Sequence, residues 1–459
     1  MEHITFDEII NAIDGEEYIK SNYMEYKSVS TDTRKIPKDS IFIALKGENF
    51  NANNFVKEAS EKGASLCIVD EIKFDSSHLN PNTSIIKVEN TKKALLKLAA
   101  YYRKKLNLKV IGITGSTGKT STKDLVAAAL SGKYKVFKTK GNFNNEIGLP
   151  LMIFQLDDSY DIAVLEMGMS NLNEIHNLAE VAEPDIALIT NIGVSHLENL
   201  KTRENILKAK MEITDFFNEK SILIINTDND LLATVENRLY SVLRTGIENG
   251  KDFKAVDINL DEKHINFRVV ESNSYTSPII NIAIPGKHNI LNTLLAIGCS
   301  RSLGMSYEEI LDGLENLEVT SMRLDIVRGN KFTIIDDSYN ASPDSMRAAI
   351  EVLATIEGKR KIAVLGTMRE LGNTSYDLHK EIGEYAKIKG IDYIYTVGEY
   401  SEAYLAGFSN SNNSKNFNNI EEVIEHIKDI VSIEDVILVK ASRSMKFENI
   451  VNNLKMINC

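Results

Sequence analysis

The sequence predicts an α/β protein of three domains, and three observations support this. The chain has 459 residues, and at roughly 100–200 residues per domain this length suggests about three domains. Two series of short apolar runs, beginning near residues 109 and 331, alternate with helical patterns, as in parallel sheets covered by helices. The segment before residue 86 belongs to neither series. We therefore expect domains at residues 1–86, 87–319 and 320–459.

The first domain is predicted to be a small α+β unit with strands IFIAL and SLCIVD, and the helical segment ENTKKALLKLAAYYRKKL bridges it to the next domain. In the central domain the apolar runs end in Gly, Thr, Asn or Asp, which is typical of buried parallel strands that open into loops. These runs are KVIGITG, YKVFKTK, DIAVLEMG, DIALITNIG and SILIINTD. The pattern predicts a doubly wound α/β domain.

Closely spaced alternating segments between about 252 and 286 predict antiparallel strands appended to the central sheet, and a helix follows over about 289–303. The second series predicts a smaller, Rossmann-like α/β domain. Its strands are KFTIIDDSY, KIAVLGTM, DYIYTVG and DVILVKAS. The Asn/Ser-rich stretch 408–419 is predicted to be a solvated surface loop.

The composition excludes several classes of protein. With 43% hydrophobic and 26% charged residues, the chain is neither disordered nor collagen-like. Its 53 Lys and Arg against 65 Asp and Glu give a net charge of −12, which argues against a general nucleic-acid binder. A local basic pocket for a small phosphorylated ligand remains open. The three cysteines, Cys67, Cys299 and Cys459, form no disulfide framework.

The chain shows no signal for secretion or membrane insertion. Its first residues are acidic, whereas a secretory signal needs a positive flank and an apolar run. No stretch approaches the ~20 apolar residues of a membrane span. We expect a cytoplasmic, soluble protein without membrane insertion or a nucleic-acid partner, and a monomer.

A glycine-rich loop follows the strand KVIGI and precedes the helical segment TSTKDLVAAAL. In this setting the loop N–H groups and the helix N-terminus can hold phosphates. Lys119 would reach the β- and γ-phosphates of ATP, and Thr120 would ligate Mg²⁺. The usual pattern has glycine at position 113, where this chain has Ile, so the match is to a variant. The predicted ATP-binding residues here are Gly115, Ser116, Thr117, Gly118, Lys119, Thr120 and Ser121.

Further polar residues stand where the central strands end. Asn142, Asn144 and Asn145 follow one run, and Glu166 and His196 follow two others. Carboxylate and imidazole groups at the carboxyl ends of strands beside a phosphate loop predict a divalent metal held against the γ-phosphate. Lys210, by contrast, lies in a helical segment, where a lysine is nearly always on a solvated face.

Two more clusters predict nucleotide contacts. Asn289 and Asn292 at i, i+3 can share a helix face suited to the edge of an adenine, although Asn289 alone could also be an N-cap. The last domain offers a second set, namely Arg323, Asp337, Tyr339, Asn340 and Ser342. Two such sets on different domains predict closure over the substrate, which excludes water from a reactive intermediate.

Taken together, these motifs resemble the Mur ligase family. The matching segments are STDTR with IFIALKGENF, GSTGKTSTKD, TKGNFNNEIGLPL, LEMGMS, TNIGVSHLENL, KAKMEI, GKHNILNT, DDSYNASPDSM, VLGTMRELG and VKASRSMKFE. Within the family, DDSYNASPDSM and the N-terminal pattern are most similar to the ligase that adds D-alanyl-D-alanine to UDP-N-acetylmuramoyl-tripeptide. The D-N-P-R or D-N-P-K signature of the ligase that adds the third residue is absent from the sequence.

The resemblance implies a role for individual residues. Ser30, Asp32 and Arg34 match the segment that handles the UDP end of the substrate, and Asn142 and Asn145 match residues near the muramoyl-peptide and phosphates. Thr120, Glu166 and His196 match the metal site. Lys210 matches a lysine that is carbamylated in related ligases, so carbamylation becomes an equal alternative to the solvated face. Asn289, Asn292, Arg323, Asp337 and Asn340 match ATP contacts, and Ser442, Arg443 and Glu448 lie in the C-terminal motif. Lys119, Glu166, His196 and Lys210 are the expected catalytic residues.

The chain departs from the family pattern at several positions. It has Asn51-Ala-Asn53-Asn54 where members commonly show a D-G-H-like run, Thr367 where they show an aspartate, and Ala441 where they show a glycine. These differences concern uridine and dipeptide contacts and leave the reaction class unchanged. His379 also lies on a family-like pattern, with a position on a helix surface as the alternative.

The implied reaction is ATP-driven amide synthesis through an acyl phosphate, with ATP and Mg²⁺ as cofactors. Three alternatives stay open at this point: another Mur-type or folylpolyglutamate-type ligase, a nucleotide-binding regulator without chemistry, and a scaffold without a ligand. The joint presence of Lys119, Glu166, His196 and Asp337 argues against the nucleotide-binding regulator.

Overall fold

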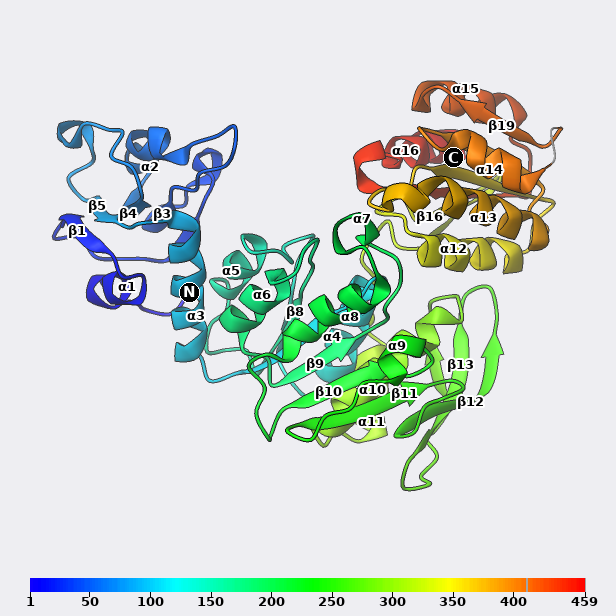
Figure 1. The fold of residues 1–459 in the computed structure, drawn as a ribbon, viewed down its shortest axis with the longest axis horizontal. Helices are drawn as coiled ribbons and strands as arrows, with labels where there is room; N and C mark the ends of the chain where they lie inside the picture. Colours follow the sequence, from blue (N-terminus) through cyan, green and yellow to red (C-terminus); the bar gives the residue numbers. More distant parts are fainter. Residues whose placement is uncertain (410–411, 459) are drawn as a thin grey trace. The chain divides into compact units, whose positions relative to one another are not determined.

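The computed structural model describes residues 1–409 and 412–458 and confirms an α/β fold built on three sheets (Figure 1). The sheets contain five, nine and six strands. The chain separates into two compact units. One unit contains Met1–Thr114, Tyr134–Ala187 and Met211–Ile222, and the other contains Gly115–Lys133, Leu188–Lys210 and Leu223–Cys459. The predicted boundaries at residues 86 and 319 are not those of the two units and stay a prediction.

The N-terminal sheet has the strand order β1-β5-β4-β3-β2. Its strands are β1 (Glu16–Ile19), β2 (Ser28–Ser30), β3 (Ser40–Ile43), β4 (Ala64–Val69) and β5 (Ser84–Lys87). All neighbours are parallel except β1, which lies antiparallel at the edge. Helix α2 (Val56–Glu61) covers one face, where Val56 and Ala59 pack with Phe42 and Cys67. Two further helices, α1 (Phe6–Ala12) and α3 (Thr91–Lys105), contact each other.

The nine-stranded sheet follows the order β14-β13-β12-β11-β10-β9-β6-β8-β7. Its strands are β6 (Lys109–Thr114), β7 (Val136–Lys138), β8 (Ile162–Glu166), β9 (Ile186–Ile189), β10 (Ile222–Asn226), β11 (Ser241–Gly246), β12 (Phe253–Leu260), β13 (Ile265–Glu271) and β14 (Ile280–Ile282). Strands β6, β8 and β7 are parallel, and β12, β13 and β14 are antiparallel, as predicted. Strand β11, which the sequence analysis missed, pairs in parallel with β12.

The helices of this part include α5 (Gly148–Ile153) and α6 (Glu174–Ala182) in the first unit. The second unit holds α4 (Lys119–Ser131), α7 (Leu197–Leu200), α8 (Arg203–Met211, up to Lys210), α9 (Asp230–Ala233), α10 (His288–Ser302) and α11 (Tyr307–Leu314). Helix α4 packs against both α10 and α11, so the helix that follows the glycine loop is fixed by neighbours within its own unit.

The C-terminal sheet has the order β15-β16-β20-β17-β18-β19. Its strands are β15 (Asp325–Arg328), β16 (Thr333–Asp336), β17 (Arg360–Gly366), β18 (Tyr393–Val397), β19 (Ser414–Phe417) and β20 (Asp435–Lys440). Only β15 is antiparallel to its neighbour. The expectation of a loop over 408–419 is wrong for Ser414–Phe417, because these residues form edge strand β19. Residues 410–411 of the predicted loop lie outside the described residues.

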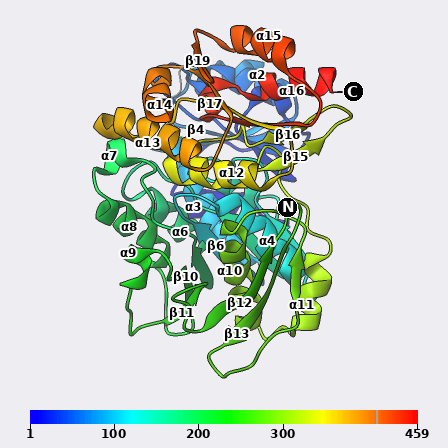
Figure 2. The same ribbon diagram turned by 90° about the vertical axis from the view of Figure 1, so that its right-hand side faces the viewer.

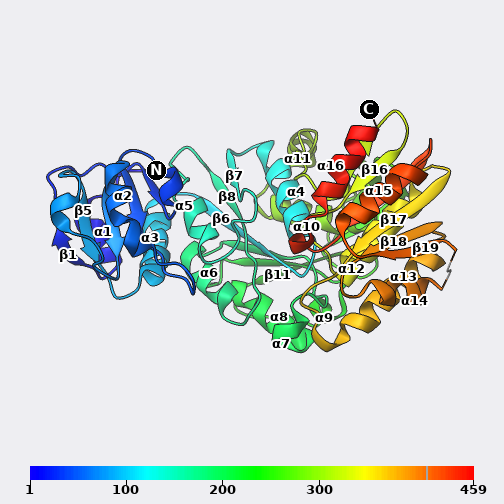
Figure 3. The ribbon, with the colours of Figure 1, turned by 90° about the horizontal axis from the view of Figure 1, so that it is seen from above.

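Helices cover both faces of the C-terminal sheet (Figures 2 and 3). On one face, α12 (Pro343–Thr355), α13 (Ser375–Ile388) and α14 (Ser401–Phe408) form one apolar core with alternate strand residues. On the other face, α15 (Ile420–Ile430) and α16 (Glu448–Ile457) form the second core. The carboxyl ends of β16, β17 and β20 carry the polar residues described next. No helix in the described part of the chain is long and apolar enough to cross a membrane.

Candidate active site

The glycine loop between β6 and α4 requires glycine at two positions. Gly115 has φ +152° and Gly118 has φ +78°, which L side chains rarely adopt. A Cβ on Gly115 would lie 1.8 Å from Oγ1 of Thr190, and one on Gly118 would lie 2.9 Å from Oδ1 of Asn292. The loop backbone is therefore in close contact with the segment that follows β9 and with α10. Gly118 is the N-cap residue of α4.

The segment after β9 holds this loop in place. The backbone N–H of Thr117 donates to Oδ1 of Asn191 at 2.9 Å, and Nδ2 of Asn191 donates to Oγ1 of Thr117 at 2.8 Å. Ser116 Oγ accepts from the N–H of Gly193 at 2.9 Å. Thr190 and Asn191 were not predicted as site residues, although both stand in the motif TNIGVSHLENL. They fix the loop before any ligand arrives.

Lys119 and Thr120 begin helix α4 as predicted. Lys119 Nζ donates to the carbonyl of Gly115 at 2.9 Å, so its cation lies over the loop. Thr120 is buried, and its Oγ1 accepts from Nη2 of Arg323 at 3.2 Å. Arg323 lies far along the sequence, and this contact brings the two predicted nucleotide sets together within one compact unit.

The guanidinium group of Arg323 is positioned to bind an anion. Its guanidinium stacks over the ring of Tyr339 at 4.0 Å, and Arg443 lies 5.7 Å from the same ring. Its Nε is buried and has no hydrogen-bond partner among the described residues. Because an orphaned guanidinium N–H is costly to bury, this donor fits a phosphate oxygen of a bound nucleotide.

Asn289 and Asn292 face each other on α10, since Nδ2 of Asn292 donates to Oδ1 of Asn289 at 3.1 Å. The alternative of an N-cap is wrong for Asn289, because Lys287 is the N-cap residue and Asn289 Nδ2 donates to the carbonyl of Pro285. Both amides are buried beside the glycine loop. Their role toward adenine stays a prediction.

Asp337 and Asn340 follow strand β16 and are held by Lys440, which ends β20. Lys440 Nζ forms an ion pair with Oδ2 of Asp337 and donates to the carbonyl of Asn340 at 2.9 Å. Oδ1 of Asp337 accepts from the N–H of Leu324 at 3.2 Å. Burial lowers the pKa of Lys440, while the adjacent Asp337 opposes that shift. Lys440 was not predicted as a site residue, although it is a charged residue directly after the apolar run VILV.

Lys210 lies on α8 and is 1% exposed. The expected solvated position is therefore wrong. Burial lowers the pKa of its ammonium group well below the usual value, and the nearby Lys119 cation lowers it further. Among the described residues no carboxylate pairs with it. Because burial disfavours the charged form of this amine, its nucleophilic form is favoured, which fits the alternative of carbamylation.

Glu166 ends strand β8 in the first unit, where it is buried and accepts from Nδ2 of Asn144 at 2.8 Å. Asn142 and Asn145 lie on the same segment as Asn144 and are exposed. Asn145 Oδ1 accepts from the N–H of Gly148 at 2.8 Å and so fixes the start of α5. Of this segment, Asn144 is thus the residue seen to contact Glu166.

His196 precedes α7 in the second unit, with its Nδ1 against a carboxylate oxygen of Glu370. Ser442 and Arg443 stand near the same turn: Ser442 Oγ accepts from the N–H of Arg369 at 2.9 Å, and Arg443 pairs with Glu448 at 3.1 Å. The structure thus places the C-terminal motif beside the turn that carries Glu370.

In the N-terminal sheet, Ser30, Asp32 and Arg34 form a compact turn after β2. Arg34 makes a two-point contact with Asp32, through Nε to Oδ1 at 2.9 Å and Nη2 to Oδ2 at 2.8 Å. Hydrogen bonds from the Arg34 side chain and backbone lower the pKa of Asp32 to about 2. Ser30 Oγ accepts from the N–H of Asp32 at 3.2 Å. Arg34 itself is exposed.

The donor types suit a divalent cation. Thr120 supplies a hydroxyl, Glu166 a carboxylate and His196 an imidazole whose second nitrogen, Nε2, is not taken by Glu370. Oxygen ligands with imidazole match Mg²⁺ or Mn²⁺. The described residues contain no cluster of three or more His, Cys, Asp and Glu able to hold a metal. Glu166 lies in the first compact unit, whereas Thr120 and His196 lie in the second, so their shared metal site stays a prediction.

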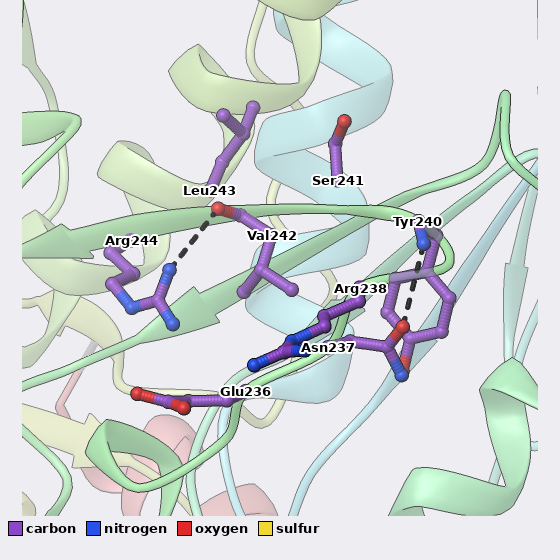
Figure 4. A pocket seen from close by; sticks show the side chains of 8 residues that line it. All are labelled: Glu236, Asn237, Arg238, Tyr240, Ser241, Val242, Leu243 and Arg244. Atoms are coloured by element: carbon purple, nitrogen blue, oxygen red, sulfur yellow. Dashed lines mark hydrogen bonds between the residues drawn. The ribbon is translucent and has the colours of Figure 1, made fainter.

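A surface hollow of about 820 Å³ lies elsewhere, along residues 236–244 between α9 and β11 (Figure 4). Its lining side chains include Glu236, Arg238 and Arg244, and Arg244 Nη1 donates to the carbonyl of Val242. None of the predicted site residues lines it. We assign no ligand to this hollow.

His379, on α13, is fully buried, so the alternative of a surface position is wrong. Its Nε2 accepts from the N–H of Met368 at 2.9 Å, and Nδ1 lies 2.6 Å from the carbonyl of Ser375. Burial lowers its pKa to about 4. The neutral ring therefore supports the turn after β17.

The chain matches two known domain families along its length: the Mur ligase middle domain over residues 113–300 and the Mur ligase glutamate ligase domain over residues 322–443. It is 40% identical over 93% of its length to the UDP-N-acetylmuramoyl-tripeptide--D-alanyl-D-alanine ligase of Bacillus subtilis (strain 168), covering 92% of that protein. The Escherichia coli (strain K12) ligase of the same name is 34% identical, with 98% of each chain covered.

Solved structures give the same result. MurF from Acinetobacter baumannii superposes with a TM-score of 0.91 at 31% identity, covering 99% of both chains. MurF ligase from Thermotoga maritima in complex with ADP superposes with a TM-score of 0.83 at 30% identity, covering 94% of this chain and 97% of that one. The fold is that of an ATP-dependent ligase. The chain belongs to the Mur ligase family.

Proposed function

We propose that this chain is the ligase that joins D-alanyl-D-alanine to UDP-N-acetylmuramoyl-tripeptide at the expense of ATP, in cytoplasmic synthesis of peptidoglycan precursors. The observation that carries the proposal is the near full-length similarity to ligases of that name at 31–40% identity. Residues 1–86 would bind the UDP end, 87–319 would bind ATP and metal, and 320–459 would bind the incoming dipeptide. The protein would act as a monomer.

The reaction proceeds in two steps. An oxygen of the tripeptide carboxylate attacks the γ-phosphorus of ATP, the bond to the ADP oxygen breaks, and an acyl phosphate forms. The amine of D-alanyl-D-alanine then attacks the acyl carbon, loses a proton and expels inorganic phosphate. Positioning and charge neutralisation dominate such phosphoryl transfer.

The chain's residues supply that positioning. Loop N–H groups after Gly115 and the Lys119 cation would hold the β- and γ-phosphates. Arg323 Nε, orphaned and buried, would donate to a phosphate oxygen. Thr120, Glu166 and His196 would hold Mg²⁺, which offsets charge on the transferring group. The paired amides of Asn289 and Asn292 would lie on the adenine side.

Lys119→Ala tests the nucleotide site. Removing this cation should reduce ligation by more than about a hundredfold, because its charge is used at the transferring phosphate, while the far-ultraviolet circular dichroism spectrum stays unchanged. Lys133→Ala is the matched control, since Lys133 pairs with Glu309 at the surface just beyond α4. Normal turnover of the Lys119 variant would refute the proposed ATP site.

A further inference from the structure

The imidazole of His196 has a carboxylate partner from a distant part of the chain. Oε2 of Glu370 lies against Nδ1 of His196 in the second compact unit. The backbones of the two segments are also joined, because the N–H of Glu198 donates to the carbonyl of Glu370 at 3.0 Å. Nδ1 of His196 is buried, so the contact is shielded from solvent on the imidazole side.

Both partners have strained backbones. His196 has φ +63° and Glu370 has φ +65°, in the left-handed region that non-glycine residues rarely adopt. Such conformations persist only where the surroundings fix them, and they concentrate at functional sites. Two of them facing each other indicate that the fold maintains this contact.

The turn that carries Glu370 is anchored on both sides. The N–H of Met368 donates to Nε2 of the buried His379 at 2.9 Å, and the N–H of Arg369 donates to Oγ of Ser442 at 2.9 Å. The N–H of Ser442 donates in turn to the carbonyl of Thr367 at 3.2 Å. Glu370 is therefore presented to His196 by a rigid turn.

A carboxylate on Nδ1 determines what the other nitrogen can do. It favours the tautomer with the proton on Nδ1, which leaves the Nε2 lone pair available to a metal. Histidines that bind metals commonly donate their second N–H to a carboxylate, which orients the ring and makes it a stronger ligand. The ion-pair contact seen here likewise places a carboxylate against the nitrogen that would not bind the metal.

We propose that Glu370 is a positioning residue that orients His196 so that Nε2 binds the divalent cation. The proposal rests on the proposed role of His196 as a metal ligand. Through Glu370, the turn after β17 would contribute to cation affinity although it supplies no ligand itself.

The test uses Mn²⁺ as the probe, bound to the full-length protein with a non-hydrolysable ATP analogue. Electron spin-echo envelope modulation detects the nitrogen of an imidazole coordinated to Mn²⁺, and titration followed by electron paramagnetic resonance gives the Mn²⁺ affinity. The variants are Glu370→Gln, Glu370→Ala and His196→Ala. The matched control is Glu399→Gln, because Glu399 pairs with Arg369 of the same turn at 3.9 Å and has no described contact with His196.

We expect an imidazole signal in the wild type and in Glu399→Gln, and none in His196→Ala. Both Glu370 variants should weaken Mn²⁺ binding about 10- to 100-fold and reduce the imidazole signal. If His196→Ala loses the imidazole signal while both Glu370 variants bind Mn²⁺ like the wild type, the positioning role of Glu370 is refuted. The role of His196 as a metal ligand would still stand. If the wild type shows no imidazole signal, His196 is not a ligand and the underlying site assignment is refuted. Tighter Mn²⁺ binding by the Glu370 variants would mean that the carboxylate blocks the imidazole, which also overturns the proposal.

Discussion

Helix α8 and the end of strand β20 each bury a lysine, and their surroundings give the two amines different roles. Lys440 is 1% exposed and pairs with Asp337. Lys210 is equally buried, but its charged neighbour is the cation of Lys119. Burial lowers the pKa of both. Burial alone therefore does not decide a lysine's role: the carboxylate of Asp337 favours the ammonium form of Lys440, whereas the cation of Lys119 further disfavours the ammonium form of Lys210.

The largest effect is expected for Lys440→Met. This change leaves the carboxylate of Asp337 buried without its counterion, which should cost about 3–5 kcal/mol of unfolding free energy. Urea unfolding measures it, with the exposed Lys428→Met as control. The double variant Lys440→Met/Asp337→Asn should recover most of the loss, and failure to recover would show that the pair is not the cause.

Lys210→Met should act in the opposite way. Removing a buried amine that has no carboxylate partner should leave the unfolding free energy unchanged or raise it, because the cost of burying the amine is removed. Ligation should nevertheless fall by more than about a hundredfold if a carbamate on Lys210 helps to hold a cation. Lys208→Met, on the exposed face of the same helix, is the control. If Lys210→Met turns over like the wild type, Lys210 packs in the core and has no role in the reaction.

His379 extends the comparison to a buried imidazole, whose pKa is lowered by burial although the hydrogen bond to the carbonyl of Ser375 opposes that shift. Its pKa in the folded state, about 4, is below the ordinary value of 6.5. The unfolded chain therefore binds more protons between these values, and stability falls as the pH falls from 6.5 toward 4. From pH 7 to pH 5 the wild type should lose about 1–2 kcal/mol that His379→Asn does not lose. Urea unfolding at both values tests this, with the exposed His78→Asn as control. If the wild type and His379→Asn lose the same unfolding free energy between pH 7 and pH 5, the lowered pKa of His379 is refuted.

The smallest effect is expected for the surface counterpart of the Lys440–Asp337 pair. Arg34 and Asp32 also form a charged contact, but solvent screens it because Arg34 is 85% exposed. Asp32→Asn should hardly change the midpoint of urea unfolding. A large loss of stability would show that solvent exposure does not explain the different contributions of the Arg34–Asp32 and Lys440–Asp337 pairs. If residues Ser30, Asp32 and Arg34 bind the UDP end of the substrate, Asp32→Asn should also lower the affinity for UDP-N-acetylmuramoyl-tripeptide. Isothermal titration calorimetry measures that affinity.

Local patterns predicted much of this molecule. The glycine loop could be located because its residues are contiguous, and the parallel strands because each is a continuous apolar run that ends in a polar residue. Strand β19 was missed because its residues, Ser414–Phe417, are mostly polar and lie at a sheet edge. Their composition is that of a loop, and only the pairing with β18 makes them a strand.

The unpredicted site residues have a common cause. Glu370, Lys440 and Asn191 act through partners far away in the sequence, so no local spacing marks them. The burial of Lys210 and His379 was also hidden, because each lies in a helical segment of mixed composition whose buried face is set by tertiary packing. Their roles depend on contacts that only the folded chain brings together.

We expect ATP cleavage by this protein to be coupled to the joining of a specific dipeptide. The most direct measurement is the release of ADP and phosphate with UDP-N-acetylmuramoyl-tripeptide, with and without D-alanyl-D-alanine, together with mass spectrometry of the nucleotide product. We predict that sustained release requires the dipeptide and equals the amount of pentapeptide product formed. Release that is independent of the dipeptide, or equal turnover with an unrelated amine, would contradict it.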